Sequence, residues 1–204
     1  IKPFIRIGYK EFTRERSAFN SAMSYMLKRA VTGDGKDVKI DFDRVLVSTG
    51  SLMPVFEGTA TQDRDKMYFD WQDNSGMENA ESADIAMLLV YNKDKETAVY
   101  DTEAAVRSDR HAELSLPNDW EGDELVAYLS FCSADGSCVS NSVRLSVSVF
   151  EIAEDEIQEQ TGTTEEKHEK MIFIPKREVQ IQTVQYSSCS PPHSIHAWKF
   201  KPPL

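Results

Sequence analysis

The spacing of apolar residues in the first part of the chain predicts a helix. In residues 11–31, EFTRERSAFNSAMSYMLKRAV, apolar side chains recur at steps of three and four, which is the period of an amphipathic helix. The sequence TGDG at 32–35 is a typical helix end. We therefore expect a helical segment within residues 1–35. The expected packing stripe consists of Phe12, Phe19, Met23, Met26, Leu27 and Ala30.

From residue 38 to residue 149 the apolar period changes to two. Short segments rich in β-branched and aromatic residues alternate with turn sequences, which is typical of β-strands. The predicted strands are VKIDF (38–42), KMYFDWQD (66–73), IAMLLVYN (85–92), ETAVYD (96–101), HAELSLP (111–117), ELVAYLSFC (124–132) and SVRLSVSVF (142–150). Seven such strands without helical crossovers predict a mainly β fold, an immunoglobulin- or fibronectin-III-like sandwich over residues 36–150.

The alternation within these strands also predicts which side chains form the core. Each chosen residue lies on an alternating strand or on a central, continuously apolar one. The predicted core residues are Phe69, Trp71, Leu88, Val90, Leu114, Leu116, Val126, Tyr128 and Leu145.

After residue 150 the composition changes again. Residues 151–170 contain eight acidic residues against two lysines, a composition typical of a solvated linker. Residues 171–204 begin with a strand-like alternation, REVQIQTVQY at 177–186, and end in a segment rich in proline and serine. We expect this tail to pair with a sheet edge, either of its own chain or of a neighbour.

Charge and hydropathy narrow the classes of partner. The net charge of −11 disfavours a nucleic-acid surface, which needs clustered lysine and arginine. The longest apolar run, IAMLLVY at 85–91, is far shorter than the roughly 18 residues of a membrane span. The chain opens on Ile1 without a signal-peptide pattern, so we expect a fragment or a processed form. The sequence does not determine the cellular compartment, and we expect the cytoplasm or an assembled particle.

Two of the three cysteines flank a predicted turn, SFCSADGSCVSNSV at 130–143. A two-residue loop at Asp135-Gly136 would place Cys132 opposite Val139, with the two sulfurs on opposite faces of the sheet. A three-residue loop would place Cys132 directly opposite Cys138, at a separation that permits a disulfide. A plain hairpin is the preferred interpretation, and a zinc site would need two further ligands.

Three groups of residues are candidates for binding. Trp120 lies in a turn beside Asp119, Glu121 and Asp123 and is the better exposed candidate for stacking on a sugar, with the carboxylates as ligands for calcium. Asp70, Asp73 and Asn74 form a second acidic loop, and Cys189, His193 and His196 form an incomplete zinc pattern. Turn formation by aspartate and asparagine is the preferred explanation of both acidic loops. The sequence contains none of the strong catalytic motifs, and it predicts no metal and no cofactor.

Several stretches resemble domain-of-unknown-function family 6266, a set of proteins of Bacteroidota. They are PFIRIGYK (3–10), SAFNSAMSYMLKRAVTG (17–33), LVSTGSL (46–52), FDWQDNSG (69–76), ADIAMLLVYN (83–92), LPNDWEGDELVAYLSF (116–131) and VSNSV (139–143). The resemblance covers about residues 1–147 and implies no activity, cofactor or site residue. Family members begin with a glycine-rich basic segment before PFIRIGYK, which fits a truncated chain. Cys132, Cys138 and the tail lie outside the pattern.

These observations favour a non-enzymatic structural or interaction protein. We expect a subunit of a larger assembly or appendage, with a phage-derived particle as one source. The expected partner is another protein chain or a second copy, bound through a sheet edge and the C-terminal tail, and neither nucleic acid nor a membrane span is expected. The alternative is a β-sandwich that binds glycans or another ligand through Trp120, and a hydrolase is the third hypothesis.

Overall fold

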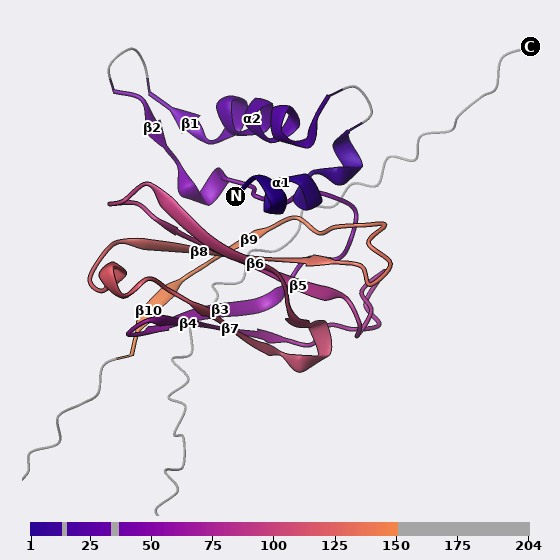
Figure 1. The fold of residues 1–204 in the computed structure, drawn as a ribbon. Helices are drawn as coiled ribbons and strands as arrows, with labels where there is room; N and C mark the ends of the chain where they lie inside the picture. Colours follow the sequence, from indigo (N-terminus) through magenta and orange to yellow (C-terminus); the bar gives the residue numbers. More distant parts are fainter. Residues whose placement is uncertain (14–15, 34–36, 151–204) are drawn as a thin grey trace, which may run out of the picture. The chain divides into compact units, whose positions relative to one another are not determined.

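Two four-stranded sheets pack face to face, and short helices cover one of them (Figure 1). The computed structural model describes residues 1–13, 16–33 and 37–150. The sheet farther from the helices has the strand order β10-β3-β4-β7. Its strands are β3 (Phe56–Asp63), β4 (Lys66–Gln72), β7 (His111–Ser115) and β10 (Val147–Val149). All its pairings are antiparallel except that of β10 with β3, which is parallel.

The second sheet, with the order β6-β5-β8-β9, is antiparallel throughout. Its strands are β5 (Ile85–Asn92), β6 (Thr97–Val106), β8 (Leu125–Cys132) and β9 (Val143–Leu145). Single turns of 3-10 helix, η3 (Arg107–Asp109) and η4 (Asn118–Trp120), lie between strands. The mainly β fold expected from the sequence is confirmed.

The structure corrects the strand prediction in three places: one strand was missed, and two predicted strands differ from those observed. β3, with the polar sequence FEGTATQD, was not predicted, because its exposed positions and its glycine hide the alternation. The predicted strand at 38–42 contributes only β2 (Lys39–Ile40), which pairs with β1 (Val31–Thr32) outside both large sheets. The predicted strand at 142–150 is interrupted at Ser146, so that β9 and β10 belong to different sheets.

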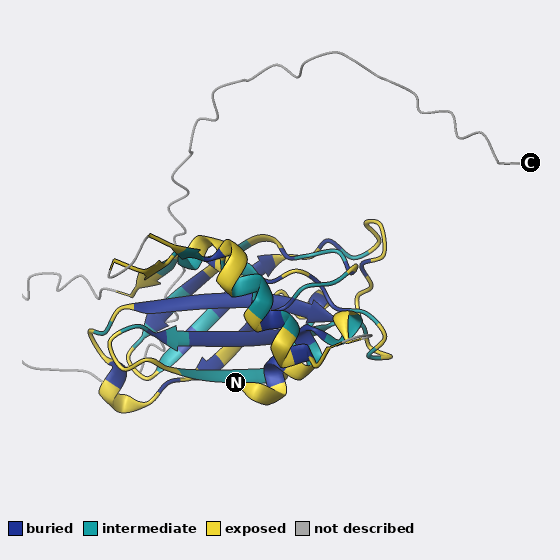
Figure 2. Ribbon diagram, turned by 90° about the horizontal axis from the view of Figure 1, so that it is seen from above, coloured by how far each residue is buried: buried dark blue, intermediate teal, exposed yellow. Residues whose placement is uncertain are grey.

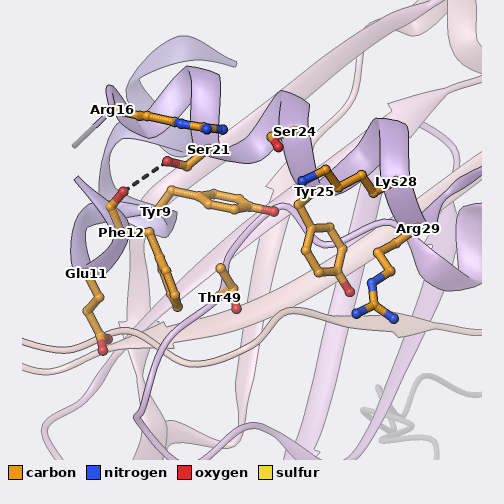
Figure 3. A pocket seen from close by; sticks show the side chains of 10 residues that line it. All are labelled: Tyr9, Glu11, Phe12, Arg16, Ser21, Ser24, Tyr25, Lys28, Arg29 and Thr49. Carbon is orange, nitrogen blue, oxygen red and sulfur yellow. Dashed lines mark hydrogen bonds between the residues drawn. The ribbon is translucent and has the colours of Figure 1, made fainter. Parts of the chain in front are cut away.

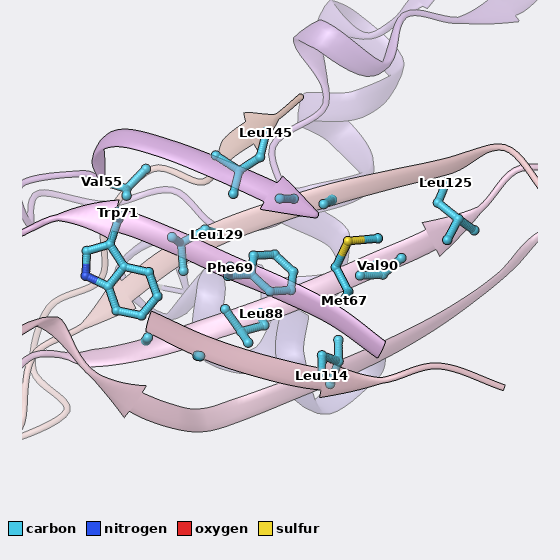
Figure 4. Close-up of a cluster of buried hydrophobic side chains, with 14 of the residues drawn as sticks. Val55, Met67, Phe69, Trp71, Leu88, Val90, Leu114, Leu125, Leu129 and Leu145 are labelled. Carbon is cyan, nitrogen blue, oxygen red and sulfur yellow. The ribbon is translucent and has the colours of Figure 1, made fainter. Parts of the chain in front are cut away.

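The space between the two sheets is filled by alternate side chains from their inner faces (Figure 4). Trp71 of β4 packs edge to face against Phe131 of β8, with ring centroids 5.8 Å apart. All nine predicted core residues are buried, which confirms the core prediction. Two of them, Val126 and Tyr128, lie on the opposite face of β8, beneath the helices, and not between the sheets.

The helical layer creates a second core on the outer face of the β6-β5-β8-β9 sheet (Figure 2). Met87 and Leu89 of β5, together with Val126 and Tyr128 of β8, pack there against helical side chains. Every residue of β8 is buried as a result. This double burial explains why the segments IAMLLVYN and ELVAYLSFC are continuously apolar instead of alternating.

The helical segment differs from its prediction in length and in orientation. It consists of α1 (Lys2–Gly8), η1 (Lys10–Phe12) and α2 (Ala18–Arg29). α2 begins after Ser17, whose Oγ accepts a hydrogen bond from the amide of Asn20 at 3.2 Å, a typical N-cap. The side chains buried beneath the layer come from α1, from the start of α2 and from Tyr9. They are Phe4, Ile5, Tyr9, Ala18 and Ala22.

The predicted packing stripe is therefore wrong for four of its six residues, whereas Ala30 is buried and Met26 packs against the second core. Phe19, Met23 and Leu27 of α2 are 47%, 39% and 62% exposed, and Phe12 is 52% exposed. α2 packs against α1, its small residues Ala18 and Ala22 are buried in that contact region, and this apolar row lies in solvent. For a helix with both a small-residue face and a large apolar face, periodicity does not indicate which one packs.

A buried ion pair joins the loops at one end of the two sheets. Arg107 is fully buried, and its Nε and Nη2 each lie 3.0 Å from Asp84 Oδ2. The guanidinium also donates to Asn74 Oδ1 at 2.6 Å and to the carbonyl of Met53 at 2.9 Å. It lies over the ring of Phe131, 3.8 Å from the ring centroid. Burial lowers the pKa of Arg107, while Asp84 opposes that shift.

Tyr9 and Tyr128 allow a test of the helical layer at alkaline pH. Each is 1% exposed, and their hydroxyls donate to the carbonyls of Leu46 at 2.8 Å and Phe42 at 2.9 Å. Phe42 lies in η2 (Phe42–Arg44). Burial raises the pKa of both phenols well above the ordinary value of 10.0. Because the unfolded chain ionises first, stability should be full below pH 10 and should fall as the pH rises beyond it.

We therefore expect two of the seven tyrosines to ionise last, together with unfolding, in an absorbance titration of the phenolates. The double variant Tyr9→Phe/Tyr128→Phe should lose this late phase and show a weaker dependence of unfolding on alkaline pH. Simultaneous ionisation of all tyrosines near pH 10 in the folded protein would contradict the prediction.

Candidate functional site

A groove of about 710 Å³ lies between η1 and α2 (Figure 3). α2 contributes one side of it, and η1 with the adjoining loops contributes the rest. The lining residues are Tyr9, Glu11, Phe12, Arg16, Ser21, Ser24, Tyr25, Lys28, Arg29 and Thr49. The groove is open to solvent and is lined by several charged groups.

Glu11 joins the groove to the loops that contain Ser51 and Val139. Its carboxylate accepts hydrogen bonds from the amide of Val139 at 2.8 Å and from the amide of Ser51 at 3.2 Å. Gly50 permits this approach, because a Cβ at that position would lie 2.2 Å from Glu11 Oε1 and 2.3 Å from the Val139 carbonyl oxygen. The two amides partly compensate the negative charge of Glu11.

Three cationic side chains therefore set the charge of the groove. Arg16, Lys28 and Arg29 are exposed, and none of them forms an ion pair with another residue of the described ranges. Lys28 and Arg29 lie in the last turn of α2, where the helix dipole favours positive charge. The exposed ring of Phe12 provides apolar surface beside them. This combination suits a ligand that has both carboxylates and apolar groups.

The hydroxyl groups of the groove have structural partners. Ser21 Oγ donates to the carbonyl of Phe12 at 2.9 Å, which joins α2 to η1 (dashed in Figure 3). Tyr9 donates to Leu46, as described above. No histidine or cysteine is among the described residues that line the groove. The arrangement provides charge and shape for binding and contains no paired nucleophile and base of the kind that covalent catalysis uses.

None of the groove residues was among the predicted site residues. A local sequence signal nevertheless exists: residues 1–33 contain seven lysines and arginines against two glutamates, in a chain of net charge −11. A count of charge per segment would have shown this basic N-terminal region.

The predicted sugar-stacking residue is not available for binding. Trp120 is only 3% exposed and belongs to the core between the sheets. This corrects the expectation that a tryptophan in a turn is exposed: η4 folds its side chain inward over the sheet ends. The glycan hypothesis therefore lacks the exposed aromatic ring on which a sugar would stack.

The acidic residues around Trp120 bind a lysine. Lys95 forms ion pairs with Asp123 and with Asp119, and Asn92 Nδ2 donates to Asp123 Oδ2 at 2.6 Å. The hydrogen bonds from Lys95 and Asn92 lower the pKa of Asp123. Glu121 is exposed in the same turn. These contacts join the turn to the end of β5, which is the structural role that turn-forming aspartates commonly have.

The second acidic loop also serves the fold. Asn74 is buried, where it accepts a hydrogen bond from Arg107 and donates to the carbonyl of Pro54 at 3.1 Å. Asp73 accepts from the amide of Ser75 at 2.9 Å, and Asp70 lies 2.8 Å from Nδ1 of His111. Within the described ranges, no three His, Cys, Asp or Glu side chains are grouped as they would be to hold a metal ion.

The hairpin at 130–143 adopts the register in which the cysteines do not face each other. Cys132 pairs with Val139, and the amide of Ser133 donates to the carbonyl of Cys138 at 3.0 Å. Both thiols are free, so the alternative with a disulfide is not the one found. Ser133, Asp135 and Ser137 hold the turn by side-chain hydrogen bonds, which lower the pKa of Asp135 to about 2.

Two further predictions fall outside the described residues. These are the pattern Cys189, His193 and His196, and the tail strand at 177–186. The edges that such a strand could join are β10 and β7 in one sheet and β6 and β9 in the other. Pairing at an edge therefore stays a prediction. None of the helices in the described ranges has the length and hydropathy of a membrane span.

Comparison with known proteins identifies a family relationship. The model of the family described as "Family of unknown function (DUF6266)" matches residues 1–146. This range includes the helical layer, the groove and every strand except β10. No curated protein and no solved structure gives a significant match to the chain.

Proposed function

Since the chain belongs to the DUF6266 family, which assigns it no activity, we propose from the structure that it is a non-enzymatic interaction protein. It acts as a subunit of a larger assembly, and its helical layer binds an acidic protein segment that also carries apolar side chains. The observation that carries the proposal is the groove between η1 and α2, whose lining includes Arg16, Lys28 and Arg29 together with the exposed ring of Phe12.

The charge distribution favours a peptide over other anionic partners. Three cations distributed along one groove are few for a nucleic acid, which contacts proteins through many phosphates along its backbone. The rest of the chain is acidic and would repel an extended polyanion. A short acidic segment needs only a few ion pairs, and its apolar side chains can cover Phe12 and, beyond the groove, the row Phe19, Met23 and Leu27.

The exposure of the apolar row Phe19, Met23 and Leu27 on α2 supports a binding role for that row. Natural monomers seldom expose several large apolar side chains in a continuous group unless the surface binds something. Phe19, Met23 and Leu27 recur at four-residue steps and form one such group along α2. Association of two chains through their α2 helices is disfavoured. Residues 16–29 contain basic side chains and no acidic one, so this contact would bring like charges together.

Fluorescence anisotropy tests this function with a labelled peptide that places isoleucines between glutamates. We expect the full chain to bind it, with affinity falling as salt is added. Lys28→Glu/Arg29→Glu should weaken binding by about tenfold or more. The matched control is Arg64→Glu/Arg110→Glu, which makes the same charge change at two exposed arginines outside the groove.

Equal losses in the two double variants would show that only net charge matters, and would contradict a specific groove. Equal binding of a single-stranded DNA of the same charge would point to a different class of partner. A melting curve for each variant checks that the helical layer is intact, because a glutamate in the last turn of a helix opposes the dipole.

A further inference from the structure

The acidic segment that follows the last strand has the chemistry that the groove accepts. Residues 151–159, EIAEDEIQE, contain five acidic residues and no lysine or arginine, with Ile152 and Ile157 between them. Charge and hydropathy therefore complement Arg16, Lys28, Arg29 and Phe12. The chain thus carries both a basic, partly apolar groove and a segment of the composition that would fill it.

The point at which this segment leaves the fold determines which groove it can reach. β10 belongs to the sheet farther from the helices, and the amide of Phe150 donates to the carbonyl of Gln62 of β3 at 2.8 Å. The groove lies in the helical layer, beyond the other sheet (Figure 1). Phe150 and the groove of the same chain are therefore on opposite sides of the β6-β5-β8-β9 sheet.

The length of the segment makes a neighbouring groove easier to fill than its own. Nine residues span at most about 30 Å when fully extended. The sheets lie about 10 Å apart, and the helical layer adds a further ~10 Å. A path from Phe150 around the edges of the sheets to the groove of the same chain would use most of the extended length of this segment. A second copy can place its groove next to the segment without such a path.

We propose that the groove binds residues 151–159 of a second copy of this chain. The inference rests on the proposed function and names the occupant. Groove and segment are different surfaces, so the contact is heterologous: each copy has one groove and one segment to offer. Repetition of such a contact produces a closed ring or an open chain of subunits. Salt should weaken the assembly, because ion pairs at exposed side chains are screened.

Two charge-reversed chains provide the test. In the first, Lys28→Glu/Arg29→Glu makes the groove negative; in the second, Glu154→Lys/Asp155→Lys/Glu156→Lys changes the net charge of residues 151–159 from −5 to +1. Light scattering measures the mass of each full chain in solution over a range of concentrations. We expect the unmodified chain to assemble and each variant alone to dissociate at concentrations about tenfold higher than the unmodified chain does.

An equimolar mixture of the two variants should recover the assembly, because each groove then meets a segment of opposite charge in the other chain. Arg64→Glu/Arg110→Glu, the same control as above, should assemble like the unmodified chain. An increase in mass only on mixing also distinguishes binding between copies from binding within one chain. If each segment filled the groove of its own chain, the addition of the other variant would not change the mass.

Two outcomes would overturn the inference. One is an unmodified chain that is monomeric at every concentration, and the other is a mixture that stays as dissociated as its components. If the labelled acidic peptide still binds the groove in either case, the proposed function stands and the occupant is another protein. If the peptide does not bind either, both proposals are wrong.

Discussion

Replacement of Arg107 by methionine is expected to lower the free energy of unfolding by about 3–5 kcal/mol. The substitution keeps much of the side-chain volume and removes the charge. It leaves the carboxylate of Asp84, which is 1% exposed, without its ionic partner, and it deprives Asn74 and the carbonyl of Met53 of their donors. An unpaired buried charge and unsatisfied buried polar groups are among the most destabilising changes a fold can suffer.

Urea denaturation followed by tryptophan fluorescence measures this loss, because Trp71 donates from Nε1 to the carbonyl of Arg107 at 2.8 Å. Arg110→Met is the matched control: the same change at an exposed residue three positions later should alter stability by about 0.5 kcal/mol or less. The double variant Arg107→Met/Asp84→Leu should lose less than the sum of its single changes, since it removes both charges together. A loss below about 1 kcal/mol in Arg107→Met would show that the pair contributes little.

The second large effect is expected for Phe4→Ala, at about 3–5 kcal/mol. Phe4 is fully buried beneath the helical layer, and its ring packs edge to face on Tyr100 of β6, with centroids 6.0 Å apart. The alanine would leave a cavity between α1 and the outer face of the sheet. Because that face carries Met87 and Leu89, loosening of α1 also exposes apolar surface of a central strand.

Phe12→Ala provides the control, since the same substitution eight residues later removes a ring that is 52% exposed. It should leave stability almost unchanged and weaken binding of the acidic peptide. If Phe4→Ala lowers the free energy of unfolding as little as Phe12→Ala does, the helical layer does not fold cooperatively with the sheets. Thermal unfolding followed by circular dichroism, combined with the peptide assay, separates the two effects.

The candidate site was harder to foresee than the fold. Trp120 looked exposed because its neighbours Asp119, Glu121 and Gly122 are turn residues, yet its ring fills the core between the sheets. Five of the ten groove residues lie on α2, whose apolar pattern led to the prediction of a different face of the helix. In both cases the local sequence describes the backbone well, and the direction of the side chain depends on packing that is distant in sequence.

The pattern of apolar residues was sufficient to predict a mainly β fold, the strands β4 to β8 and all nine proposed core residues, since alternation reports directly on which side of a strand is buried. The register of the cysteine hairpin, the division of residues 142–150 between two sheets and the burial of both faces of β8 required the folded chain. These features depend on which surfaces meet in space. α2 packs against α1, with Ala18 and Ala22 buried in the cluster beneath the helices, and Phe19, Met23 and Leu27 lie in solvent. Periodicity records that a face is apolar; only contact between distant segments decides whether that face is covered.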